Sequence, residues 1–220
     1  MLYLALRHRR EEIVEELLRD GRVDMHRRDE ADRIPLHYAC DMLDHESTVG
    51  QLFSKTERVN ARDRRGHTPL HLLSQKKGSS QRQKGCRAYL IELFLQSGRI
   101  DTNGFDQDGW TPLHHACTIS DNPATVKLLL NSTASTDARD MKGFTPLHYA
   151  VRAGCLDTVK VLLDYGSVDI FNNSVDGGTV AQSASHLGDG TYWHCFFGTS
   201  QQSIQHLDTA SLNSILRHGD

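Results

Sequence analysis

The sequence predicts an all-α repeat solenoid, and three observations support this fold class. The string Thr-Pro-Leu-His recurs at residues 68–71, 111–114 and 145–148, and a related Ile-Pro-Leu-His lies at 34–37. The four prolines are 34, 43 and 34 residues apart, and further apolar segments follow the strings. Self-similarity at such a period is typical of units that stack in a row and bury their apolar faces against their neighbours.

Each unit is predicted to begin with a turn and a first helix. An aspartate stands three residues before a glycine at 63–66, 106–109 and 140–143, a spacing typical of a tight turn with a left-handed glycine. The threonine of the string then caps a helix, and the proline takes the first helical position, where its missing N–H costs no hydrogen bond. In the second unit, Asp32 and Ile34 replace the glycine and the threonine, so we expect this unit to be locally weak.

A second helix is predicted in each unit from the apolar residues that follow, for example within 13–18, 126–130 and 159–163. Glycines stand where these helices would end, as they do at many helix C-termini. They are Gly21, Gly98 and Gly166.

Six units in this register cover residues 1–198, because a step of 34 residues leads back from Pro35 to Met1 and forward from Pro146 to Val180. The expected units are approximately 1–26, 27–60, 61–103, 104–137, 138–171 and 172–198. Terminal units are expected to be atypical, as in the last one, where Trp193 and Phe197 replace aliphatic residues. Residues 199–220 contain apolar residues at roughly helical spacing and are predicted to form a capping helix.

Nine additional residues lie in the third unit, near residues 76–87, between its two predicted helices. The segment is rich in Gly, Ser and Gln and has no acidic residue. We predict a flexible, solvated loop here, and a basic contact or nuclear-import signal is the alternative. The basic residues are Lys76, Lys77, Arg82, Lys84 and Arg87.

The order of turn, helix, loop and helix, with Thr-Pro-Leu-His-x-Ala complete at 111–116 and 145–150, resembles the ankyrin repeat family. The resemblance implies a curved stack of helix pairs with hairpin fingers on one side. It also implies a module that binds proteins through its fingers and inner helices, without catalysis. The family unit has about 33 residues, and one extra loop residue accommodates the longer period here.

Composition argues against several other classes of protein. The net charge of -3 gives no global attraction to nucleic acid or anionic membranes, and the longest apolar runs fall far short of the roughly 20 residues that a membrane span needs. The five cysteines form no Cys-x-x-Cys pair. We therefore expect buried free thiols and an intracellular location, in the cytoplasm or the nucleus.

No enzyme, metal site or cofactor is predicted. His37, His71, His114 and His148 occupy the same position in successive units, about one unit apart, so they cannot bind one ion. We expect each to form a structural hydrogen bond with the backbone of the neighbouring turn. The sequence has no phosphate-binding loop, nucleophile elbow or His-Glu-x-x-His string.

The predicted binding surface lies between the turns and the helix starts, which in ankyrin arrays face the concave groove. Aromatic side chains with nearby arginines are typical of interaction hot spots. The alternatives are rings that only cover the neighbouring finger and an arginine-rich finger that is only solvated. The expected partner-binding residues are Arg62, Arg64, Arg65, His67, Trp110, Arg139, Met141, Lys142 and Phe144.

We expect the partner to be a protein or peptide segment with acidic and apolar residues, and no oligomer is required. Two other functions stay open. The array could regulate, or recruit substrates to, a larger enzyme or channel. Alternatively, the basic finger and insert could contact nucleic acid, in which case added salt would weaken binding steeply.

Overall fold

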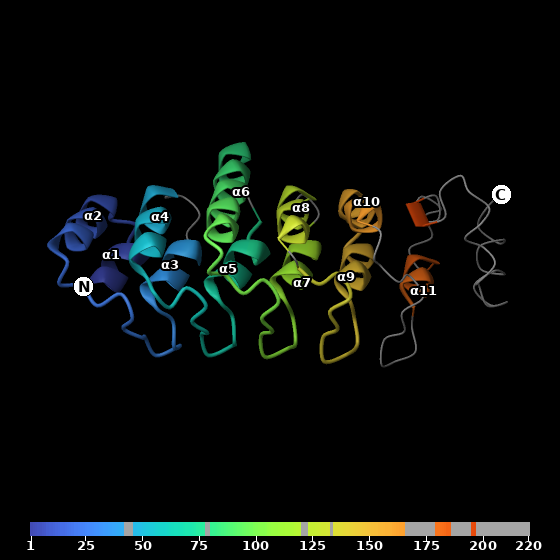
Figure 1. Ribbon diagram of the computed structural model, residues 1–220, viewed down its shortest axis with the longest axis horizontal. Coiled ribbons are helices and arrows are strands. Elements are labelled where there is room, and N and C mark those ends of the chain that lie inside the picture. Colours follow the sequence, from blue (N-terminus) through green and yellow to red (C-terminus); the bar gives the residue numbers. More distant parts are fainter. Residues whose placement is uncertain are drawn as a thin grey trace.

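The computed structural model describes residues 1–41, 46–77, 80–119, 123–132, 134–165, 179–185 and 195–196, and these residues form an elongated row of helix pairs (Figure 1). The predicted all-α repeat solenoid is therefore confirmed. The first helices of the units are α1 (Leu2–Arg7), α3 (Pro35–Asp41), α5 (Pro69–Gln75), α7 (Pro112–Cys117), α9 (Pro146–Arg152) and α11 (Val180–Ser185). The second helices are α2 (Glu11–Asp20), α4 (Glu46–Lys55), α6 (Gln81–Gln96), α8 (Pro123–Asn131) and α10 (Leu156–Asp164).

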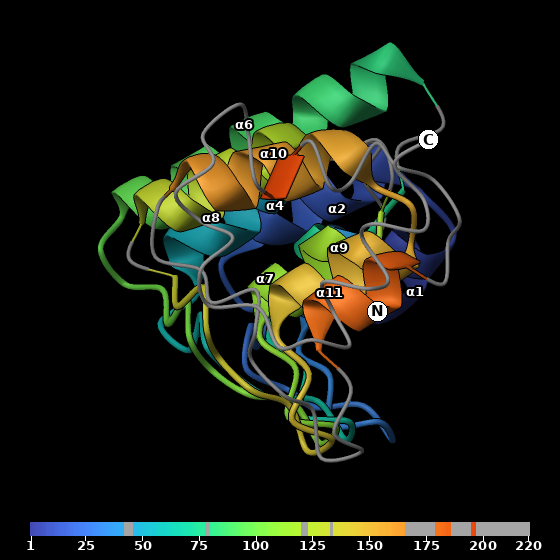
Figure 2. The ribbon, with the colours of Figure 1, turned by 90° about the vertical axis from the view of Figure 1, so that its right-hand side faces the viewer.

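The helices form two layers. Each first helix contacts the first helix of the next unit, and the second helices contact one another in the same order. In the view along the row, hairpin fingers project from one side of the two layers (Figure 2). The first helices, which lie nearer the fingers, are therefore the inner layer, and the concave face lies between this layer and the fingers.

The leucine of the recurring string forms the centre of each shared core. Leu36, Leu70, Leu113 and Leu147 are at most 1% exposed. Burial of one such side chain contributes about 1.5–3 kcal/mol. In the outer layer, the rings of Phe53 and Phe94 stack with centroids 4.1 Å apart. Because these contacts join successive units, the core extends along the row rather than closing around one centre.

The turns and helix starts have the predicted conformations. Gly66, Gly109 and Gly143 have φ of 81°, 79° and 73°, and Asp32 takes the same left-handed region with φ of 60°. Thr68, Thr111 and Thr145 are helix N-caps, each followed by proline.

Backbone hydrogen bonds connect the fingers of neighbouring units. The N–H of Arg64 donates to the carbonyl of Ala31 at 2.8 Å, and the N–H of Gln107 donates to the carbonyl of Arg65 at 2.9 Å. Another bond of this kind joins Met141 to Asp108 at 3.2 Å. The fingers therefore form a connected row, which fixes the spacing of the side chains that they carry.

The prediction of a flexible loop at the insert is wrong for residues 81–87. They form the first turns of α6, which has 16 residues and rises above its neighbours in Figure 1. Ser80 caps this helix, because its hydroxyl accepts a hydrogen bond from the N–H of Gln83 at 3.2 Å. Arg87 is only 2% exposed and donates to the carbonyl of Lys76, so the basic segment is not wholly solvated.

Some predictions fall outside the described residues. They concern Gly166, the aromatic residues Trp193 and Phe197 of the last unit, and the tail 199–220. The unit boundaries stay predictions. Gly21 and Gly98 do lie at the ends of α2 and α6 with positive φ, as predicted.

The cysteines are free thiols, and Cys40, Cys86, Cys117 and Cys155 are buried, as predicted. Among the residues that the structure describes, no helix combines the length and hydropathy needed to cross a membrane.

Candidate functional site

The repeat histidines join the inner helices α3, α5 and α7 to the finger of the following unit. The Nδ1 atoms of His71 and His114 accept the N–H of Thr68 and Thr111 at 3.1 Å. Their Nε2 atoms lie 3.1 Å from the carbonyl oxygens of Trp110 and Phe144 in the following units. The predicted structural hydrogen bond is thus confirmed.

These imidazoles are neutral in the folded protein. Burial lowers the pKa of His71 to about 3, and the nearby His115 contributes to this shift. Burial also lowers the pKa of His114 to about 4. A neutral ring that accepts at Nδ1 carries its proton at Nε2, so each ring donates to the carbonyl of the next finger.

A finger aspartate provides the polar contact at the base of each finger that the structure describes. Oδ1 of Asp106 accepts the N–H groups of Asp108 and Trp110 at 2.9 and 2.8 Å. Oδ2 of Asp106 lies 2.8 Å from Nε2 of His115 on α7. The Oδ1 atoms of Asp29, Asp63 and Asp140 in the second, third and fifth units accept backbone N–H groups in the same way. In two of these units a tyrosine hydroxyl also donates to Oδ2: Tyr38 to Asp29 and Tyr149 to Asp140.

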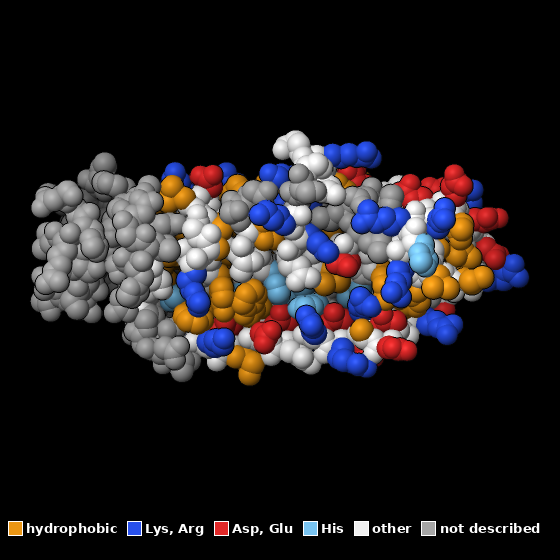
Figure 3. Space-filling model, turned by 180° about the vertical axis from the view of Figure 1, so that it is seen from behind, with side chains coloured by type: hydrophobic (Ala, Val, Ile, Leu, Met, Phe, Trp, Pro, Cys, Tyr) orange, Lys and Arg blue, Asp and Glu red, His pale blue; other side chains and the backbone are white. Residues whose placement is uncertain are grey.

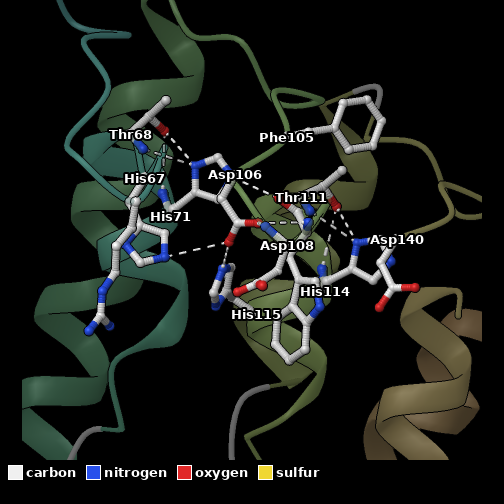
Figure 4. A network of polar contacts seen from close by, with 12 residues as sticks. His67, Thr68, His71, Phe105, Asp106, Asp108, Thr111, His114, His115 and Asp140 are labelled. Atoms are coloured by element: carbon white, nitrogen blue, oxygen red, sulfur yellow. Dashed lines mark hydrogen bonds and ion pairs between the residues drawn. The ribbon is translucent and has the colours of Figure 1, made fainter. Parts of the chain in front are cut away.

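The third unit departs from this pattern, because Leu72 has no polar atom with which to reach Asp63. His67 lies there instead, with Nδ1 3.4 Å from Oδ2 of Asp63 and Nε2 3.5 Å from Oδ2 of Asp106. Two imidazoles from neighbouring units, those of His67 and His115, therefore converge on one carboxylate oxygen (Figure 4). The nitrogen and oxygen atoms of these three side chains lie within 4.8 Å of one another.

Sequence reasoning missed this cluster because it compared only histidines at equivalent positions. His67 stands at a finger position and His115 on a helix, so the two residues occupy different positions within their repeats. One signal in the sequence could have indicated the cluster. Leu72 is apolar at the position where the other units carry a polar ring, namely Tyr38, His115 and Tyr149.

The cluster shifts the protonation of its members. Burial acts to raise the pKa of Asp106, but hydrogen bonds from His115 and His67 outweigh it and hold this pKa well below its usual range. The hydrogen bond to Asp106 raises the pKa of His67, against the effect of its partial burial. His67 therefore carries positive charge on the concave face more readily than an isolated histidine does.

The aromatic side chains form one patch of three rings. Trp110 and Phe144 do not pair directly among the described contacts, because Tyr149 lies between them, with its ring centroid 4.3 Å from that of Trp110 and 5.8 Å from that of Phe144. All three side chains are half-buried. The guanidinium of Arg152 lies 5.3 Å from the Phe144 centroid. The rings thus pack on the inner layer and also leave part of their surface open to a partner.

The three arginines of the basic finger are exposed, but they do not act as one patch. The guanidinium of Arg62 donates to the carbonyl of Phe105 in the next finger. Arg64 lines an open cavity of about 1000 Å³ at the N-terminal end of the stack, together with Arg28 and Arg33. Only Arg65 faces the aromatic side of the site.

Arg65, His67 and Trp110 line one open pocket of about 330 Å³. The other lining residues are Gln75, Gln107, Asp108 and His115. Seen from behind, histidines and carboxylates gather in a band along the lower half of the stack, flanked by lysines, arginines and an apolar patch (Figure 3). The remaining predicted residues lie on the next finger: Arg139, Met141 and Lys142 are exposed, and Met141 is 75% exposed.

Comparison with known proteins agrees with this geometry. Residues 82–174 match the family model of ankyrin repeats (3 copies). These residues therefore carry ankyrin repeats, and repeats of this family generally serve as protein-interaction modules without catalysis.

A stretch of 112 residues is 31% identical to the transient receptor potential cation channel subfamily A member 1 of Homo sapiens. It covers 50% of this chain but only 9% of the human protein. The likeness therefore concerns a small part of that protein.

Proposed function

We propose that the concave face of the third to fifth units binds a protein or peptide segment that carries acidic and apolar residues. The contact surface consists of Arg65, His67, Trp110, Phe144 and Tyr149, and we call it the groove surface. The observation that carries the proposal is the open pocket where Arg65, His67 and Trp110 meet beside the three-ring patch. Aromatic and arginine side chains are enriched at the centres of protein interfaces.

The arrangement suggests how such a segment is recognised. Arg65 and His67 attract a carboxylate, because the hydrogen bond to Asp106 raises the pKa of His67 and favours its positively charged form. Apolar side chains of the segment cover the exposed edges of the three-ring patch. Met141 on the next finger extends the apolar surface with a flexible side chain that adapts to different shapes.

The proposed module works by binding alone and belongs in a reducing, intracellular compartment. Its free thiols, four of them buried, support the reducing, intracellular compartment.

The proposal can be tested with peptides selected on the complete chain from a random displayed library. We expect the selected peptides to combine acidic and large apolar residues. Arg65→Glu and Trp110→Ala should each weaken the tightest peptide at least about tenfold, which corresponds to about 1.4 kcal/mol. Arg19→Glu on α2 is a matched control, since Arg19 is exposed and lies far along the chain from the groove surface. Equal affinities of the Arg65→Glu and Arg19→Glu variants would contradict the proposal.

A second candidate is a regulatory or substrate-recruiting part of a larger channel or enzyme. The partial likeness to a cation channel subunit favours it. An antibody raised against the chain should then detect, in cells of the source, a protein much longer than 220 residues. A native protein of this length would exclude it.

Contact with nucleic acid is a lesser alternative, supported by the exposed Arg82 on α6 and opposed by the net charge of -3. It would appear as a steep loss of affinity with added salt.

A further inference from the structure

We propose that His67, Asp106 and His115 form a binding site for a divalent transition-metal ion of the zinc class, at the junction of the third and fourth units. Oδ2 of Asp106 lies 3.5 Å from Nε2 of His67 and 2.8 Å from Nε2 of His115. All three ligand atoms lie within 4.8 Å of one another. Ligand atoms about 2 Å from a tetrahedral zinc ion are roughly 3.3 Å apart, so small rotations of the two imidazoles suffice to receive the ion.

The surroundings of the three side chains favour the same conclusion. Two backbone N–H groups hold Oδ1 of Asp106, which leaves Oδ2 facing the two rings. The other ring nitrogen of His67, Nδ1, lies 3.4 Å from Oδ2 of Asp63. Histidines that bind metals usually donate their second N–H to such a carboxylate, which fixes the orientation of the ring.

The ligand types select the kind of ion. Two imidazoles and one carboxylate suit zinc and neighbouring transition metals, whereas magnesium and calcium prefer oxygen ligands. His67 and His115 both line the open 330 Å³ pocket, so a fourth coordination position is accessible to water. Asp108 lines the same pocket and supplies a further carboxylate on this side (Figure 4).

The neighbouring units show why the site forms only at this junction of the described chain. At the equivalent helix position, Tyr38 and Tyr149 direct a phenol, a poor zinc ligand, at their finger aspartates. At the position equivalent to His67, Phe144 has no ligand atom. An ion between His67 and His115 would connect two successive fingers and restrain the groove next to Trp110. The inference does not depend on the proposed partner.

The test is a calorimetric titration of the complete, reduced chain with Zn²⁺ alone, with Co²⁺ as a visible-absorption probe of coordination. We expect one Zn²⁺ per chain, a cobalt spectrum typical of four ligands, and an increase in Tm of about 5 °C at saturation. Mg²⁺ should give none of these effects.

Matched variants separate this site from other histidines and from the thiols. His115→Tyr reproduces the Tyr149 contact with aspartate, so it keeps the fold but removes one ligand. His67→Phe introduces the residue found at position 144. Both should weaken Zn²⁺ binding at least about thirtyfold, whereas Tyr149→Phe, which removes the same kind of contact one unit along, should leave it unchanged. Absence of saturable Zn²⁺ binding by the folded wild type, or equal affinity in the His115→Tyr variant, would overturn the proposal.

Discussion

At the scale of single residues, a buried neutral imidazole couples the second, third and fourth units each to the unit that follows. His37, His71 and His114 each make the same pair of contacts, one with their own helix start and one with the following finger. The contact between the imidazole and the helix start does not require a capping hydroxyl. Ile34 has no hydroxyl, yet the N–H of Ile34 still donates to Nδ1 of His37 at 3.2 Å. The second unit therefore keeps the hydrogen bond of its histidine to the next unit, although it lacks the threonine cap.

These histidines predict how stability depends on pH. The pKa values of His71 and His114 fall from 6.5 to about 3 and about 4 on folding. The unfolded chain therefore binds protons below pH 6.5 that the folded chain does not, so stability is complete above this pH and is lost as the pH falls toward 4. Each histidine should remove about 2 kcal/mol between pH 7 and pH 5. Urea unfolding at the two pH values measures this loss.

A variant isolates the histidine contribution from that of the carboxylates. His114→Gln keeps a side chain that can hydrogen bond but does not titrate, so its stability should fall by about 2 kcal/mol less than that of the wild type over the same pH range. His67 acts in the opposite direction, because its raised pKa gives stability that is present below pH 6.5 and lost as the pH rises through the folded value. An identical pH dependence of variant and wild type would show that the imidazole of His114 is not held neutral.

The same residues mark the limit of what the sequence predicts. The positions of His71 and His114 are repeated, so their common contacts were predictable from the pattern. His67 was predicted only as a partner-binding residue, since nothing in its own unit shows that Asp106 of the next unit lies 3.5 Å away. Contacts that occur once in an array are set by packing between units, which a repeated string does not encode.

At the scale of elements, the fingers depend on glycines that lie against the next finger. Gly109 has φ of 79°, and a Cβ atom there would lie 2.8 Å from the backbone N of Met141. Gly21 at the end of α2 has φ of 68° with open space around it. Gly21→Ala should therefore cost about 1 kcal/mol from backbone strain alone.

Gly109→Ala should cost clearly more, about 3 kcal/mol, because the neighbouring finger must also move. Urea unfolding of both variants at pH 7 gives the comparison. Equal costs would show that the fingers do not lie in backbone contact.

The helical insert gives a second prediction at this scale. Gly85 lies inside α6, and a Cβ atom there would meet nothing within 4 Å. Gly85→Ala should therefore stabilise the chain by up to about 1 kcal/mol, because alanine favours helix more than glycine does. Circular dichroism should show unchanged or slightly increased helicity, and a destabilised variant would contradict a helix at this position.

The insert was mispredicted for a physical reason. Its residues lack an apolar stripe, so periodicity gave no helical signal, and Gly and Ser at 78–80 suggested a loop. Gln, Arg and Lys are nevertheless good helix formers, and Ser80 supplies the cap. The first turns of α6 extend a helix whose later residues, such as Ile91 and Phe94, are anchored in the core.

At the scale of the whole molecule, the protein is a row of units whose cores are shared between neighbours. This architecture was predictable because the string, the spacing and the second helices all indicated the same repeat. The direction of each arginine side chain was not predictable. Arg62 contacts the next finger, Arg64 lines the cavity at the N-terminal end, and Arg65 lines the pocket beside Trp110. The candidate site was therefore predicted as a region and resolved into one groove surface only by the structure.

The most direct test of the central claim, that a partner lies along the groove surface, is hydrogen–deuterium exchange of the complete chain with and without a saturating selected peptide. We expect the peptide to slow exchange in the fingers at 62–67, 106–110 and 140–144. The second helices α8 and α10, which lie in the outer layer, should exchange as in the free chain. Protection confined to the outer helices or to the first turns of α6, with the three fingers unchanged, would contradict the account.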